Sequence, residues 1–150
     1  MRYTEPSEYF KNNEIMELLE DCKSSFAEIR SYRDKFRERG FVDIDDYAAA
    51  LDVLTGLYMF VEEIYSLAQA YKEICEDEAH HDLRLEAEKS GTKITADALK
   101  VEAHRSVSLI IRVRNEVEAH KNSCEKAIIT IQSNLNRMTR QQPGSGGGNK

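Results

Sequence analysis

A single apolar stripe near the end of the chain constrains its fold more than any other feature. Between residues 103 and 138 the apolar positions alternate in steps of four and three, which keeps them on one face of a helix. Eleven positions keep this alternation over roughly five heptads: Ala103, Val107, Ile110, Arg114, Val117, Lys121, Cys124, Ile128, Ile131, Leu135 and Met138. The pattern predicts one helix over about 96–140 with coiled-coil packing.

Two further helices are predicted from similar stripes. The stripe from Ile15 to Phe36 predicts a helix over about 7–39, and Gly40 is expected to end it in the left-handed conformation. A wider apolar face predicts a second helix over about 44–89, beginning near Asp43 or Asp45, at the centre of a bundle. The predicted fold is all-α: an antiparallel helical hairpin or bundle in one domain over 1–140, followed by a flexible glycine-rich tail over 141–150.

The length of these helices predicts self-association. A helix over 96–140 is about 65 Å long at ~1.5 Å per residue, whereas a compact domain of this size has a radius of gyration near ~15 Å. The stripes are therefore expected to be buried against neighbouring copies, and the charges of Arg114 and Lys121 to set the register or the oligomeric state. The expected interface is Val107, Ile110, Arg114, Val117, Lys121, Ile128, Ile131 and Leu135.

Composition argues against several classes of protein. No apolar run approaches the roughly 20 residues of a membrane span, and the N-terminus does not resemble a secretory signal, so we expect a cytoplasmic protein. Cys22, Cys75 and Cys124 occupy apolar positions and are interpreted as small core residues. The sequence shows no glycine-rich phosphate loop, nucleophile elbow or zinc-protease motif, so neither an enzyme nor a cofactor is expected.

The stretch from Cys75 to Asp82 is rich in residue types that bind metals. Glu76 and His80 are four residues apart, as are Glu78 and Asp82, and His81 lies between them. Any charged helix surface has the same spacing, so we interpret the stretch as a solvated face and predict no metal site.

The charge is distributed unevenly. Residues 1–92 carry 11 Lys and Arg against 22 Asp and Glu, a net charge of −11, whereas residues 93–150 carry 10 against 5, a net charge of +5. A basic C-terminal third is expected to bind a polyanion or to pair with the acidic part of another copy.

Two basic sets are candidate contacts for single-stranded DNA, because cations neutralise phosphates and aromatic rings stack on unpaired bases. The first is Arg33, Lys35 and Arg37, with Tyr32 and Phe36 interleaved; a cationic last turn that complements the helix dipole is the favoured alternative. The second set follows a phosphate backbone or forms salt bridges with the acidic second helix, and both interpretations stay open. The set comprises Arg84, Lys89, Lys93, Lys100, Arg105, Arg112 and Arg114, of which the first six are the expected DNA contacts and Arg114 is assigned to the oligomer interface.

One segment resembles a known family. The stretch Glu88-Lys89-Ser90-Gly91-Thr92-Lys93-Ile94-Thr95-Ala96-Asp97-Ala98-Leu99-Lys100-Val101 leads into a helix ending Ile128-Ile129-Thr130-Ile131-Gln132-Ser133-Asn134-Leu135-Asn136-Arg137-Met138. Over about residues 84–140 the chain resembles the UvsY-type phage recombination mediators. The short basic L-K-A-R motif of that family is replaced here by Leu83-Arg84-Leu85-Glu86-Ala87. The resemblance implies an oligomeric ring protein that binds single-stranded DNA and helps load a recombinase onto strands coated by single-strand-binding protein.

The leading hypothesis is therefore a homo-oligomeric accessory protein whose partners are single-stranded DNA and a recombinase or single-strand-binding protein. The main alternative is a structural or adaptor coiled-coil protein whose basic face binds an acidic protein. A small helical enzyme or ligand-binding bundle comes last, because no catalytic constellation supports it.

Overall fold

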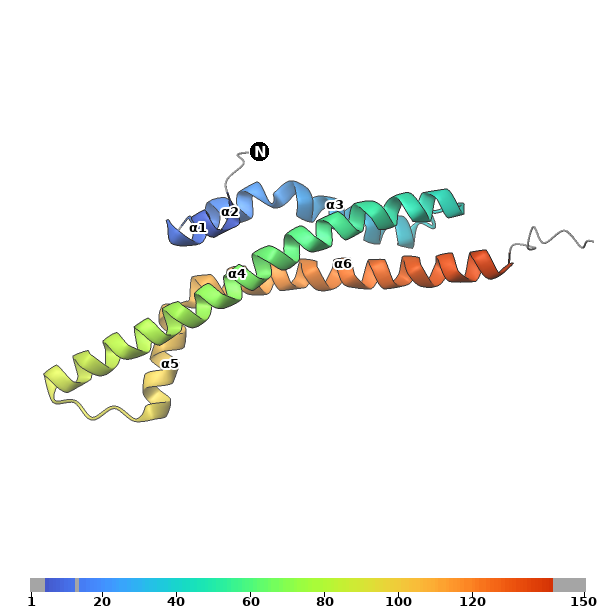
Figure 1. Ribbon diagram of the computed structural model, residues 1–150. Helices are drawn as coiled ribbons and strands as arrows, with labels where there is room; N and C mark the ends of the chain where they lie inside the picture. Colours follow the sequence, from blue (N-terminus) through green and yellow to red (C-terminus); the bar gives the residue numbers. More distant parts are fainter. Residues whose placement is uncertain (1–4, 13, 142–150) are drawn as a thin grey trace, which may run out of the picture. The chain divides into compact units, whose positions relative to one another are not determined.

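The computed structural model describes residues 5–12 and 14–141. Within these ranges the chain is all-helical, without strands, as predicted. No helix in this part of the chain is both long and apolar enough to span a membrane. The helices follow one another as labelled in Figure 1: α1 (Pro6–Lys11), α2 (Ile15–Asp21), α3 (Lys23–Arg37), α4 (Ile44–Ser90), α5 (Ala96–Ser106) and α6 (Ser108–Gln141).

The described chain divides into two compact units, which share α4 and α6. Unit 1 comprises residues 5–12, 14–22 and 62–119, and unit 2 comprises residues 23–61 and 120–141. Unit 1 therefore contains α1, α2, α5, the C-terminal part of α4 and the first turns of α6. Unit 2 contains α3, the N-terminal part of α4 and the rest of α6. The predicted single domain over 1–140 stays a prediction, and the predicted tail over 141–150 lies, apart from Gln141, outside the described residues.

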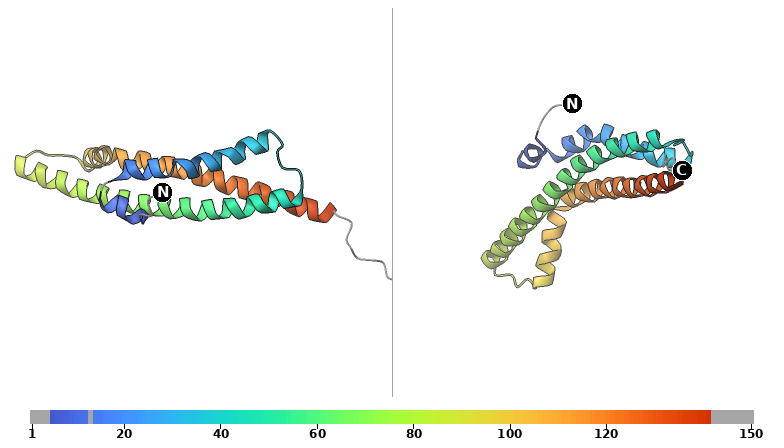
Figure 2. Two further views of the ribbon diagram at one scale, coloured as in Figure 1. Left: turned by 90° about the horizontal axis from the view of Figure 1, so that it is seen from above. Right: turned by 45° about the vertical axis from the view of Figure 1, so that its right-hand side comes forward.

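Three helical segments pack together in unit 2 (Figure 2). Sγ of Cys124 on α6 donates a hydrogen bond to the carbonyl oxygen of Leu54 on α4 at 3.2 Å. The ring of Phe26 on α3 stacks on His120 of α6 with centroids 4.0 Å apart. These contacts join α6 to both other segments. The buried apolar residues of unit 2 are Phe26, Ile29, Tyr32, Ala50, Leu54, Val61, Cys124 and Ile131.

In unit 1, α4 contacts helices from both ends of the chain. The ring of Phe10 on α1 lies 5.5 Å from that of Tyr71 on α4, between centroids. Nη1 of Arg114 on α6 donates a hydrogen bond to Oε1 of Gln69 on α4 at 2.9 Å. The buried apolar residues of unit 1 are Tyr9, Phe10, Ile15, Leu18, Cys22, Ile64, Ala68, Leu99, Ala103, Val107, Ile110, Val113 and Val117.

Two predicted helices are interrupted. The helix predicted over 96–140 divides at Val107, whose φ of −106° and ψ of 20° are not helical. Ser106 supplies a physical reason, because its Oγ donates to the carbonyl of Ala103 at 2.7 Å and so competes with the helical hydrogen bonds. The helix predicted over 7–39 is divided into α1, α2 and α3, with breaks after Lys11 and at Cys22.

The helix predicted over 44–89 is confirmed as α4, and its two ends show why. The Asp43 carboxylate accepts a hydrogen bond from the backbone N–H of Asp46 at 2.9 Å, as an N-cap does. At the other end Gly91 has a φ of +67°, and the N–H of Thr92 donates to the carbonyl of Ala87 at 3.1 Å. This pair of features is the Schellman ending of a helix.

The predicted cap at Gly40 is wrong by one residue. Arg39, not Gly40, has the positive φ, at 54°, and the N–H of Gly40 donates to the carbonyl of Lys35 at 2.9 Å. α3 therefore ends in the same motif as α4, but with an arginine instead of a glycine in the left-handed position.

The apolar stripe of α5 and α6 is largely covered within one chain. Of the eight expected interface residues, Val107, Ile110, Val117 and Ile131 are buried, and the other four (Arg114, Lys121, Ile128 and Leu135) are half-buried. The physical reason given for self-association, that these stripes need a neighbouring copy, is therefore wrong. Self-association itself stays a prediction. Of the cysteines, Cys22 and Cys124 are confirmed as core residues and Cys75 is half-buried.

Candidate nucleic-acid interface

The basic residues predicted as DNA contacts in unit 1 are exposed, and two of them are paired with carboxylates of their own helices. Nε of Arg84 lies 3.8 Å from Oε1 of Glu88, and Nη1 of Arg105 donates to Oε1 of Glu102 at 3.1 Å. Each salt bridge thus joins two residues about one turn apart on the same helix. Arg105 on α5 therefore pairs within α5 and not with the acidic second helix. The remaining expected DNA contacts of this set, Lys89, Lys93, Lys100 and Arg112, are also exposed.

A cavity of about 530 Å³ lies where α4 is connected to α5 in unit 1. It brings Arg84 and Lys93 together with His80, but Glu88 lines it as well and offsets part of their charge. The described residues of unit 1 carry 9 Lys and Arg against 19 Asp and Glu, a net charge of −10. This surrounding charge disfavours a polyanion at the cavity.

The second candidate is a groove of about 520 Å³ between α3 and α6 in unit 2, called here the α3–α6 groove. One side is formed by α3 and the other by α6. Its lining combines cations, apolar side chains and hydroxyls: Ile29, Arg30, Arg33 and Phe36 from α3, and Ser123, Lys126, Ala127 and Thr130 from α6. No carboxylate is among these lining residues.

Helical spacing explains why these residues share the groove. On α3, residues at i, i+4 and i+7 fall on one face, which places Ile29, Arg33 and Phe36 along one side, with Arg30 next to them. On a helix the spacing i, i+3 and i+7 has the same effect. On α6 this second spacing aligns Ser123, Lys126 and Thr130. The cations thus stand beside an apolar floor of Ile29, Phe36 and Ala127.

The structure separates the three residues of the first predicted set. Arg33 lines the groove; its side chain is 64% exposed, and Nε lies 3.4 Å from Oδ1 of Asp34. Lys35 does not line it, because its Nζ lies over the ring of Tyr32, 4.9 Å from the centroid. Arg37 is exposed in the last turn of α3 and is not a lining residue either.

Sequence reasoning missed Lys126, Ser123 and Thr130 as candidate contacts. Lys126 lies on α6, and nothing in either helix alone indicates that its face meets that of Arg33. A signal was present nonetheless: the described residues of α6 in unit 2 contain four Lys and Arg and a single acidic residue, Glu125. Unit 2 as described carries 10 Lys and Arg against 8 Asp and Glu, a net charge of +2.

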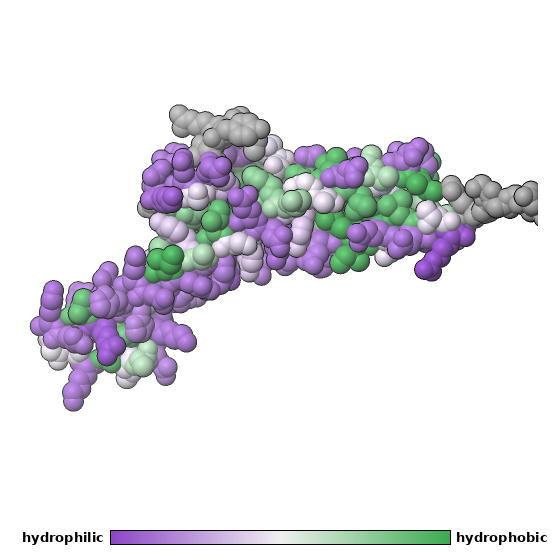
Figure 3. Space-filling model, in the orientation of Figure 1, coloured by the Kyte–Doolittle hydropathy of each residue, from purple (hydrophilic) through white to green (hydrophobic). Residues whose placement is uncertain are grey.

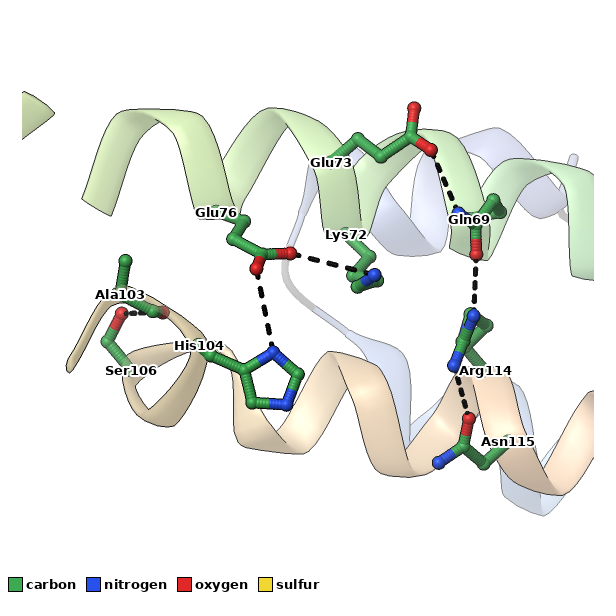
Figure 4. A network of polar contacts seen from close by, with 9 residues as sticks. All are labelled: Gln69, Lys72, Glu73, Glu76, Ala103, His104, Ser106, Arg114 and Asn115. Atoms are coloured by element: carbon green, nitrogen blue, oxygen red, sulfur yellow. Dashed lines mark hydrogen bonds and ion pairs between the residues drawn. The ribbon is translucent and has the colours of Figure 1, made fainter. Parts of the chain in front are cut away.

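A polar network links α4 to α5 and α6 in unit 1 (Figure 4). Glu76 lies 3.6 Å from Nζ of Lys72 and 3.5 Å from Nδ1 of His104. Gln69 donates to Glu73 at 2.9 Å and accepts from Arg114. Glu76 and its neighbours therefore contact basic side chains; over residues 5–12 and 14–141, no three His, Cys, Asp or Glu side chains converge as metal ligands would.

No family model, curated protein or solved structure matches the chain. The resemblance to the UvsY-type mediators therefore stays a prediction.

Proposed function

We propose that this protein binds single-stranded DNA in the α3–α6 groove. The observation that carries the proposal is the lining of the groove, in which three cations border an apolar floor. No carboxylate lines the groove, although Asp34 pairs with Arg33 from outside the lining. Arg30, Arg33 and Lys126 supply the positive charge that attracts phosphates. The half-buried Phe36 supplies a surface on which an unpaired base can lie.

The same lining favours a single strand over a duplex. The bases of a duplex are stacked and paired, so a duplex presents phosphates without a free apolar face. A single strand presents both and satisfies the cations and the apolar floor together. The hydroxyl of Ser123 is a further donor of the kind that binds phosphate oxygens, whereas that of Thr130 donates to the carbonyl oxygen of Lys126.

The proposal extends to the architecture. We propose that α4 and the segment formed by α5 and α6 make an antiparallel hairpin and that the protein is a homo-oligomer. The contacts of unit 1 support the hairpin: Gln69 on α4 pairs with Arg114, whereas Glu76, further along α4, pairs with the earlier residue His104. By the family resemblance, the biological role is assistance in recombinase loading during phage recombination or replication.

The test is fluorescence anisotropy of a labelled oligo-dT titrated with the full chain. Binding is expected to weaken with added salt, with a slope of log affinity against log salt of about −2 if three cations neutralise phosphates. A duplex of the same length is the matched control and is expected to bind more weakly. Unchanged anisotropy at micromolar protein in ~50 mM salt would exclude the proposal, because low salt favours any phosphate contact.

An adaptor that binds an acidic protein is the second candidate. The apolar floor of the groove favours it, because protein interfaces also combine apolar centres with charged rims. Poly-glutamate labelled in the same way separates the two candidates. Binding of poly-glutamate but not of oligo-dT would favour the adaptor.

A further inference from the structure

The C-terminal part of α4 carries an outward face that complements the α3–α6 groove in charge and in apolar character. Ile74 and Leu85 are 54% and 41% exposed, and their separation of eleven residues places them on one face, about 16 Å apart. Asp77, Glu78 and Asp82 are exposed on or beside this face. We call these five residues the acidic face of α4.

Figure 3 shows one side of the C-terminal part of α4 and of α5. Hydrophilic side chains dominate the surface over the C-terminal part of α4 and α5, and apolar side chains appear there only as isolated points. An acidic helix with isolated exposed apolar residues is not explained by packing within unit 1. Its half-buried positions Glu76, Ala79 and Leu83 lie on the opposite side of the helix from Ile74 and Leu85.

We infer that the acidic face of α4 in one copy docks in the α3–α6 groove of a second copy. Three carboxylates, those of Asp77, Glu78 and Asp82, meet the three cations of the groove. Ile74 and Leu85 meet Phe36 and Ala127, the two half-buried members of the apolar floor. A second copy fits better than an arbitrary acidic protein because this chain itself supplies both complementary surfaces.

Such a contact joins two different surfaces and is therefore heterologous. Each copy keeps one groove and one acidic face free, so the contact repeats and makes either a ring or an open string. This interface differs from the one expected along the α5–α6 stripe, which the chain covers by itself. Since both occupants are anionic, the acidic face and single-stranded DNA compete for one groove; this last consequence rests on the proposed function.

A charge exchange tests the docking without DNA. In one variant Asp77, Glu78 and Asp82 are replaced by Lys, and in the other Arg30, Arg33 and Lys126 are replaced by Glu. Each variant alone has like charges on both surfaces and is expected to be monomeric by sedimentation velocity at ~100 µM in ~50 mM salt, where the wild type associates. Mixed at equal concentration, the two variants are expected to associate again, because each surface now finds its opposite.

A matched control and a second measurement keep the test decisive. Replacing Glu8, Glu14 and Glu17 by Lys changes the charge of unit 1 equally, at exposed positions outside the acidic face, and is expected to leave association intact. Association of the wild type is expected to fall with added salt. A monomeric wild type, or a mixture of variants that stays monomeric while both are helical by circular dichroism, would overturn the inference.

DNA binding is read separately. Oligo-dT added to the associated wild type is expected to lower the average mass towards that of one chain with bound DNA. Association without any binding of oligo-dT would remove the proposed function and leave the docking intact. If the wild type bound oligo-dT but never associated, the docking would be excluded and the proposed function would remain.

Discussion

Arg114 on α6 and Gln69 on α4 form a hydrogen bond of 2.9 Å from Nη1 to Oε1 within unit 1. Nη2 of Arg114 donates to Oδ1 of Asn115 at 2.7 Å, whereas Nε is buried and has no partner. The guanidinium thus lies half-buried on an apolar stripe, where amide oxygens accept two of its hydrogen bonds.

Replacing Arg114 by Met is therefore expected to leave stability unchanged or to raise it by up to about 1 kcal/mol. Methionine fills the same space without an unpaired buried donor. Gln69→Ala keeps the guanidinium but removes its acceptor, so a loss of about 1–2 kcal/mol is expected. Urea denaturation of both variants measures the difference. A loss larger for Arg114→Met than for Gln69→Ala would contradict this account.

The groove proposal makes a sharp comparison on one helix. Arg33→Glu is expected to weaken oligo-dT binding about tenfold or more at low salt and to reduce the salt slope by about 0.7. Lys35→Glu makes the same change of charge two residues away, on a side chain that lies over Tyr32 outside the groove, and is expected to weaken binding less than about threefold. Anisotropy titrations measure both. Equal effects would show that overall charge, not the groove, governs binding.

Two further substitutions, Lys126→Glu and Lys100→Glu, compare the α3–α6 groove with the basic residues of unit 1. Lys126 lines the groove from α6, so its replacement is expected to match Arg33→Glu, about a tenfold loss. Lys100 lies on α5 in the acidic unit 1, and its replacement is expected to have little effect on the same titration. A larger loss for Lys100→Glu than for Lys126→Glu would move the site to unit 1.

Base stacking in the groove is open to a spectroscopic test. The chain contains no tryptophan, so Phe36→Trp introduces a single reporter among the lining residues. Oligo-dT is expected to quench its fluorescence, because a base stacks on the indole. Ile129→Trp is the control, on α6 of the same unit, 55% exposed and not a lining residue. Equal quenching at both positions would argue against stacking in the groove.

The sequence predicts which residues face the core better than it predicts where helices stop. Val107 keeps its place in the four–three alternation and is buried, yet the helix breaks there. The four–three spacing of apolar residues indicates which face of a helix a side chain occupies. It does not reveal a break of one residue in the helix, because the spacing continues across the break. Cys22 shows the same effect between α2 and α3. α4 was predicted to within one residue because Asp43 and Gly91 mark its ends chemically.

The candidate site was predicted only in part, for a related reason. Arg33 was found from a local run of basic and aromatic residues, and such a run is visible in one helix. Lys126 becomes a candidate only once α3 is known to pack on α6, and the pairing of helix faces is a non-local property. Arg84 and Lys93 do share a cavity, and the acid that lines it, Glu88, belongs to the helix whose acidic character is visible in the sequence.

Burial of two thiols is expected to make stability depend on pH above 9. Burial raises the pKa of the Cys124 thiol from 9.0 to about 11, and burial, together with the Asp21 carboxylate, does the same for Cys22. Between pH 9 and 11 the folded state keeps the thiol protons while the unfolded state loses them. The stability of the folded state is therefore unaffected by the thiols below pH 9 and falls as the pH rises from 9 towards 11. The loss is about 3 kcal/mol per thiol.

Urea denaturation at several pH values between 8 and 11 measures this loss. The double variant Cys22→Ala, Cys124→Ala is expected to be less stable at pH 8, because it leaves small cavities, but to lose less stability between pH 9 and 11. If the free energy of unfolding fell with pH equally in both proteins, burial would not raise the pKa of the two thiols.

The ends of α3 and α4 form a matched pair for a final prediction. Each helix ends on a residue with positive φ, Arg39 at 54° and Gly91 at 67°. A side chain in this conformation costs about 1 kcal/mol, since Cβ approaches the backbone, whereas glycine has no Cβ. Arg39→Gly is therefore expected to stabilise the protein by up to about 1 kcal/mol, less the entropy that glycine adds to the unfolded chain.

Gly91→Ala is expected to destabilise by about 1 kcal/mol for the converse reason. Apart from Gly91 itself and its two chain neighbours, no residue has an atom within 4 Å of a Cβ built at Gly91, so the effect comes from the local backbone and not from a clash. Arg39→Ala removes the charge but keeps the strained conformation, so it separates the two contributions and is expected to change stability little. Urea denaturation of the three variants gives the order Arg39→Gly, Arg39→Ala, Gly91→Ala from most to least stable. If Arg39→Ala were as stabilising as Arg39→Gly, repulsion among the cations at the end of α3, rather than backbone strain, would set the stability of this helix end.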